Sequence, residues 1–85
     1  MYDYMFEWLK TATKQERHCD EIETFAKKHP LIFMKYHMYC KGIVQNDINT
    51  ENYQKSKENM IKLFDSNKDD FKPVFEAVKR MKGIS

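Results

Sequence analysis

The chain has 85 residues, enough for one small domain that buries only a limited fraction of its surface. Two Gly and two Pro residues are too few for the turns of an all-β fold, so the composition favours helices. Fifteen Lys and Arg residues against 13 Asp and Glu residues leave a net charge of +2, far below the basic excess of dedicated nucleic-acid-binding proteins.

The amino-terminal segment, residues 2–10, is predicted to form a helix with apolar residues on more than one side. The main apolar strip has a second strip beside it, formed by two aromatic residues four positions apart. The helix is therefore either sandwiched in the core or in contact with a partner through one strip. The apolar residues of the two strips are Tyr2, Met5, Phe6 and Leu9, and then Tyr4 and Trp8.

A second helix is predicted over residues 14–28. Thr13 and Glu16 have the Ser/Thr-x-x-Glu spacing of a capping box. The alternative is one continuous helix over residues 2–28, because the apolar stripe of the first segment continues into the second. We favour a break or kink between them.

The most apolar run, LIFMKYHMYC at residues 31–40, follows the helix-ending pair His29-Pro30. A central helix over residues 31–41, ended by Gly42, is predicted. The run also alternates with a period of two, but no comparable strand exists to pair with it, so the helix is preferred. The polar residues Lys35 and His37 interrupt this run and must reach solvent, so the central helix is expected to have an exposed edge. Tyr39 lies beside that edge.

Two further helices complete the predicted fold. One covers residues 51–65 and is capped by Asn49 or Thr50. A turn at residues 66–70 leads to the last helix, which has Pro73 in its first turn and ends at Gly83. The predicted fold is therefore a single all-α domain, a compact bundle of four to five short helices around the central helix 31–41.

Metal binding and catalysis are not expected. The only set that resembles a metal site is His18, Cys19, His37 and Cys40, and its spacing matches no zinc motif. We interpret these residues as core thiols and surface histidines, with no metal and no cofactor. The acidic pairs Asp20-Glu21 and Asp69-Asp70 fall in first helical turns, where capping and dipole stabilisation explain them. The chain lacks a convergent polar pocket and a glycine-rich loop, so we expect no enzyme.

An RNA-binding surface is the alternative hypothesis. Residues 31–85 hold ten Lys or Arg residues against seven Asp or Glu residues, whereas residues 1–30 hold five against six. Lysines that contact phosphates, beside rings that stack on bases, are typical of single-stranded RNA recognition. The candidate residues are Lys35, His37, Lys41, Lys72, Lys79, Arg80 and Lys82.

The preferred hypothesis is a protein interface, because 12 aromatic residues are many for a domain of this size. Aromatic residues are enriched at interface cores. The candidate partner-binding residues are Tyr4, Trp8, Tyr36 and Tyr39. Homo-oligomerisation through the first helix is the simplest way to cover the aromatic residues that a small core cannot enclose. The alternative is that all the aromatic residues are interior.

Small size, richness in Lys, Asn and Asp, and a lone helical domain together resemble the accessory proteins of large lytic phages. The resemblance lies in overall style, and it implies binding and inhibition of a host enzyme or defence factor. The predicted function is therefore a small non-catalytic protein that binds, and can inhibit, a macromolecular partner. Two cysteines form no disulfide framework, no signal peptide is expected at the amino end, and the apolar run is too short to span a bilayer, so a cytoplasmic location is expected.

Overall fold

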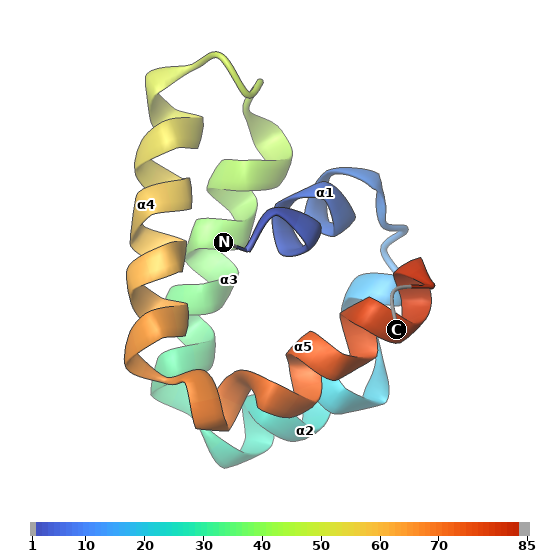
Figure 1. The fold of residues 1–85 in the computed structure, drawn as a ribbon. Coiled ribbons are helices and arrows are strands. Elements are labelled where there is room, and N and C mark those ends of the chain that lie inside the picture. Colours follow the sequence, from blue (N-terminus) through green and yellow to red (C-terminus); the bar gives the residue numbers. More distant parts are fainter. Residues whose placement is uncertain (1, 84–85) are drawn as a thin grey trace.

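The computed structural model describes residues 2–83, and this range contains five α-helices, a short 3₁₀ turn and no strand. Helices α3 and α4 form an antiparallel hairpin, α2 and α5 lie side by side across one end of it, and α1 packs against α3 and α5 (Figure 1). The all-α fold is confirmed. The elements are α1 (Asp3–Thr11), the 3₁₀ turn η1 (Glu16–His18), α2 (Asp20–Lys28), α3 (Pro30–Gln45), α4 (Glu51–Ser66) and α5 (Lys68–Lys82).

The break between the first two helices is confirmed, but the second helix begins later than predicted. The capping box forms, since the Thr13 amide donates to Glu16 Oε1 at 3.2 Å and the Glu16 amide donates to Thr13 Oγ1 at 3.1 Å. It opens only η1. Cys19 then adopts an extended conformation, with φ −66° and ψ 165°, and α2 begins at Asp20. The chain therefore turns sharply between α1 and α2.

Helix α3 is longer than predicted, and Gly42 lies inside it. A Cβ atom at Gly42 would lie 2.7 Å from Ser56 Cβ on α4, which is closer than side chains tolerate. Glycine is therefore required for close packing between α3 and α4, and its predicted role in ending the helix was wrong. The carboxyl end of α3 is held by Lys10, whose ammonium donates to the carbonyl oxygens of Ile43 and Asn46 at 3.2 and 2.8 Å.

The link between α4 and α5 is much shorter than the predicted turn over residues 66–70. Only Asn67 separates the two helices, and its side chain donates to the carbonyl oxygen of Leu63 at 2.9 Å. Because α5 already begins at Lys68, Pro73 lies in its second turn rather than its first. Gly83 ends α5 with a left-handed conformation, φ 73°, as predicted.

The cap of α4 identifies which of the two candidate residues begins the helix. Thr50 has an extended conformation, and its Oγ1 accepts a hydrogen bond from the Tyr53 amide at 3.2 Å. This bond satisfies one of the backbone donors that a helix leaves free at its start.

The core is aromatic and has Phe64 at its centre. The ring of Phe64 lies 5.0 Å from each of the rings of Tyr2, Phe71 and Phe75, measured between centroids. All 12 aromatic side chains are buried or half-buried. The domain therefore encloses its aromatic residues, which is the alternative to an aromatic interface.

Candidate functional site

The four aromatic residues predicted to bind a partner do not form a surface. Trp8 and Tyr36 are only 2% and 5% exposed, so the prediction that they bind a partner directly is wrong for the folded domain. Tyr4 and Tyr39 are half-buried. The buried residues of α1 belong to the main core, which leaves no large apolar face on α1 for homo-oligomerisation.

The seven residues of the predicted RNA-binding surface are divided between α3 and α5. On α5, Arg80 pairs with Glu21 at 3.1 Å and Lys82 pairs with Glu7 at 3.3 Å. The ammonium of Lys79 lies over the ring of Tyr4, 5.3 Å from its centroid. The outer face of α5 is thus largely compensated by the protein itself, although Lys72 is exposed.

The largest exposed apolar residues lie on α3, in the run that the sequence marked as core. Leu31, Met34 and Met38 are 75%, 67% and 59% exposed. On a helix with 100° between residues they fall within about 60° of one another. We call these three residues the α3 stripe. The predicted partner-binding residues were aromatic and did not include this strip. The polar residues Lys41 and Gln45 continue the strip, and they indicate that it faces solvent.

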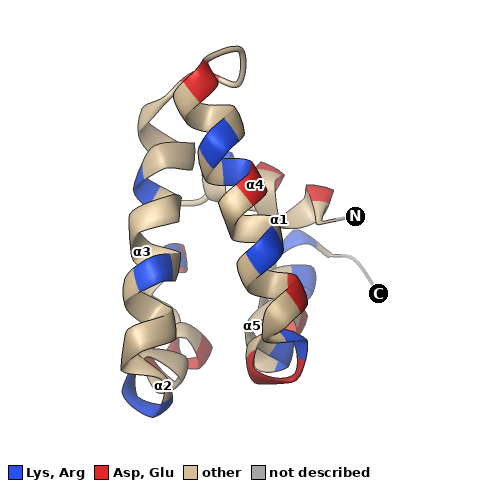
Figure 2. Ribbon diagram, turned by 90° about the vertical axis from the view of Figure 1, so that its left-hand side faces the viewer, with Lys and Arg blue, Asp and Glu red and all other residues tan. Residues whose placement is uncertain are grey.

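The surface of α3 is also unusual in charge. Residues 30–45 contain Lys35 and Lys41 and no Asp or Glu. In Figure 2, α3 carries blue segments and no red segment, whereas α4 and α5 carry both colours. Lys35, His37 and Lys41 are all exposed, which agrees with the exposed edge expected for this helix. The α3 stripe is thus bordered by positive charge.

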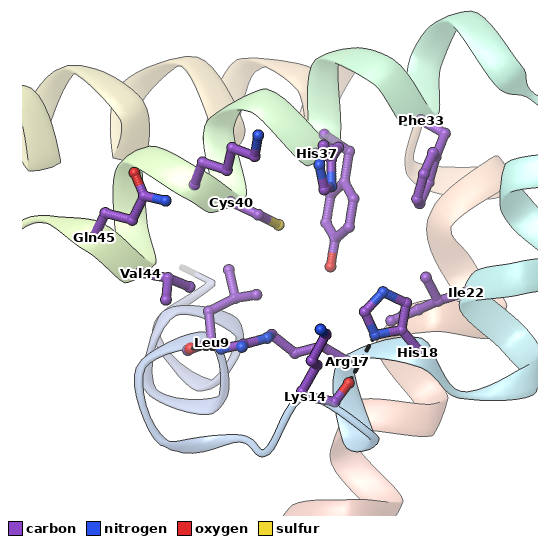
Figure 3. Close-up of a pocket in the computed structure, with 12 residues that line it drawn as sticks. Leu9, Lys14, Arg17, His18, Ile22, Phe33, His37, Cys40, Val44 and Gln45 are labelled. Carbon is purple, nitrogen blue, oxygen red and sulfur yellow. Dashed lines mark hydrogen bonds between the residues drawn. The ribbon is translucent and has the colours of Figure 1, made fainter.

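A pocket of about 420 Å³ opens between α3 and the connection from α1 to α2 (Figure 3). Lys41 lines this pocket and follows Met38 by three residues, so the pocket and the α3 stripe share an edge. The pocket has no Asp or Glu in its wall. Its lining residues are Leu9, Lys14, Arg17, His18, Ile22, Phe33, Tyr36, His37, Cys40, Lys41, Val44 and Gln45.

Two side chains of the α1–α2 connection are held in place beside this pocket. Arg17 Nη1 donates to the carbonyl oxygen of Leu9 at 3.4 Å, a long bond that leaves the other guanidinium donors free. His18 Nδ1 lies 2.7 Å from the carbonyl oxygen of Lys14. A carbonyl oxygen can only accept, so Nδ1 holds the proton and Nε2 is the free ring nitrogen.

Cys40 points into the pocket (Figure 3), but its thiol is expected to be unreactive. Burial raises the pKa of its thiol to about 12, and this effect outweighs the opposing influence of the Tyr36 hydroxyl and the Arg17 charge. Burial also raises the pKa of Tyr36 well above its usual value. Since the thiolate is the nucleophile and the metal ligand, Cys40 is a poor candidate for either role at neutral pH.

The residues considered for a metal site are only partly brought together. His18, His37 and Cys40 line the pocket, whereas Cys19 does not. Across residues 2–83, no group of three or more His, Cys, Asp or Glu side chains is placed to hold a metal ion. The pairs Asp20-Glu21 and Asp69-Asp70 lie in the first turns of α2 and α5, where they complement the helix dipoles.

Alkaline pH is expected to destabilise the fold. The pKa of Cys40 rises from 9.0 to about 12, and the pKa of Tyr2 rises from 10.0 to about 12, through burial and then a 2.7 Å hydrogen bond to Asp65. A group with a raised pKa stabilises the fold fully below its unfolded pKa, and this contribution disappears as the pH approaches the folded pKa. The free energy of unfolding should therefore fall from about pH 9 towards pH 12.

Urea denaturation at a series of pH values, followed by circular dichroism, measures this dependence. In the Cys40→Ala variant the contribution of the thiol is absent. The free energy of unfolding should therefore begin to fall at a higher pH, where the tyrosines titrate. A urea midpoint that stays constant across the range would contradict the prediction.

By fold and surface, the chain is a small all-α domain with an exposed apolar stripe and an adjoining basic pocket on α3. No helix within residues 2–83 has the length and apolar character needed to span a membrane. Comparison with protein-family models, with curated proteins and with solved structures finds no match to this chain.

Proposed function

We propose that this chain is a non-catalytic interaction protein that binds a protein partner through the α3 stripe. The observation that supports this proposal is the exposure of Leu31, Met34 and Met38, each more than half open to solvent on one side of a single helix. Contiguous exposed apolar side chains rimmed by polar residues are typical of protein interaction sites. Methionine is common at such surfaces because its flexible thioether adapts to different partners.

The partner that suits this surface is an amphipathic helix with an acidic border. Helix α3 has 16 residues, about 24 Å, so a partner helix of similar length can follow the stripe. Lys35 and Lys41 flank the stripe and have no acidic residue on their own helix. A second copy of α3 would bring further lysines and no carboxylate, so charge complementarity favours a different chain.

Binding of this kind would inhibit the partner where the captured helix is needed for its activity. That outcome is the one implied by the resemblance to phage accessory proteins. RNA binding is the alternative, and the same binding experiment distinguishes it.

A pair of designed helical peptides tests the proposal by isothermal titration calorimetry. Both place leucine at positions i, i+3, i+4 and i+7, and one has glutamate where the other has lysine on the flanks. The glutamate peptide is expected to bind at least tenfold more tightly, about 1.4 kcal/mol. The double variant Met34→Glu, Met38→Glu should lose this binding, because it places charge on the apolar contact and repels the acidic flanks.

The matched control changes two exposed residues of α4, Asn52→Glu and Asn59→Glu, which add the same charge on a different helix. The control variant should bind as the unmodified protein does. Equal affinity for both peptides, or equal losses in both variants, would refute the proposal. Binding of a single-stranded oligouridine that weakens steeply with salt would instead support the RNA alternative.

A further inference from the structure

The pocket beside α3 has the size and lining of a small-molecule site. Its volume of about 420 Å³ lies within the range of roughly 300–1,000 Å³ that is usual for such sites. Its apolar wall comes from three elements, with Leu9 on α1, Ile22 on α2, and Phe33 and Val44 on α3. A cavity with this wall can accept the apolar body of a ligand.

Five of the residues that line the pocket are basic and none is acidic. Lys14, Arg17 and His18 come from the connection between α1 and α2, and His37 and Lys41 face them from α3. Among the ion pairs of residues 2–83, none involves these five side chains, whereas Arg80 and Lys82 on α5 are both paired. The positive charge around the pocket is therefore not compensated by a neighbouring carboxylate.

Arg17 is the residue best placed to receive an anion. It is half-buried, and its bond to the Leu9 carbonyl fixes the guanidinium along the pocket wall while leaving further donors free (Figure 3). Arg17 lines the pocket together with Tyr36 and Cys40. A guanidinium in partly dry surroundings binds carboxylate and phosphate groups through two parallel hydrogen bonds.

We propose that this pocket binds a small organic anion, whose apolar body enters the cavity and whose carboxylate or phosphate group is held by Arg17 with Lys14 and Lys41 nearby. His18 also lines the pocket, and its Nε2 takes no part in the bond to the Lys14 carbonyl oxygen. The ligand needs both parts, because the wall offers no acceptor-rich surface to a sugar and the basic rim offers nothing to a neutral hydrocarbon. The pocket is a separate site from the α3 stripe, since neither Met34 nor Met38 lines it, and the two sites share only the border residue Lys41.

Four probes separate the contributions of the two parts: octanoate, octyl phosphate, 1-octanol and acetate. Titration calorimetry should show saturable one-to-one binding of octanoate or octyl phosphate, and the tighter of the two identifies the preferred head group. Octanol, which lacks the charge, and acetate, which lacks the chain, should each bind at least tenfold more weakly. Amide chemical shifts should change around Leu9, Arg17 and Val44.

Arg17→Gln should weaken binding of the anionic probes at least tenfold and leave octanol unchanged. The matched control is Arg80→Gln, which removes an exposed arginine outside the pocket and should leave all four affinities unchanged. Circular dichroism of both variants verifies that each is folded. Octanol binding as tightly as octanoate, absence of saturable binding, or equal effects of the two substitutions would overturn the proposal.

Discussion

Phe64→Ala is expected to destabilise the domain by about 3–5 kcal/mol, the usual cost of removing a fully buried phenyl ring. Phe64 has no exposed surface, and the three rings that surround it at 5.0 Å belong to the chain start and to α5. These rings cannot close the resulting cavity without moving whole helices. The loss is comparable to the total stability of many small domains, so the variant is expected to be largely unfolded at 37 °C.

Urea denaturation measures this effect, with Trp8 as the reporter because it is the only tryptophan and is buried. Phe33→Ala is the matched control, since Phe33 is half-buried at the pocket and its removal leaves a space that water can enter. It should cost much less. Equal destabilisation by the two substitutions would show that Phe64 is not the centre of the core.

Gly42→Ala is expected to destabilise the domain by about 2 kcal/mol, even though alanine favours a helix interior by up to about 1 kcal/mol relative to glycine. The added methyl group would lie 2.7 Å from Ser56 Cβ, an atom fixed to the backbone of α4. A rotation of the Ser56 hydroxyl cannot relieve that contact. The two helices must separate, and overpacking of this kind typically costs about 1–3 kcal/mol.

A double-mutant cycle shows whether Ser56 is the cause. Gly42→Ala combined with Ser56→Gly removes the opposing Cβ and should recover most of the lost stability. Gly42→Ala combined with Ser56→Ala keeps that Cβ and should recover little. Thermal denaturation of the unmodified protein, of Gly42→Ala, of Ser56→Gly and of the variant that combines these two substitutions gives the coupling energy. Additive effects of Gly42→Ala and Ser56→Gly would contradict a contact between these positions.

Local signals in the sequence located the helices well. The Thr50 cap, the His29-Pro30 pair and Gly83 each act on the backbone through neighbours only a few positions away, so their effects are visible in the sequence. Gly42 was misinterpreted because a glycine that ends a helix and a glycine that lets two helices touch look alike in the sequence. Its role depends on Ser56, which lies on another helix.

The candidate site was harder to predict. The amino-acid composition does not distinguish aromatic residues at an interface from aromatic residues in a core. Only the packing of the folded chain shows where each of them lies. Trp8 and Tyr36 turned out to be interior, whereas Leu31, Met34 and Met38 turned out to be exposed. The pocket joins Arg17 to Lys41 across 24 positions of the chain, and no spacing rule relates them.

The sequence by itself determined the helical class, the positions at which most helices begin or end, and the absence of acidic residues from α3. These properties follow from local backbone preferences and from composition. Only the tertiary structure decided that one side of the LIFMKYHMYC run faces solvent and that the cations of the α1–α2 connection face those of α3. The physical reason is that exposure depends on which surfaces the other helices cover, and that choice is made by packing over the whole chain.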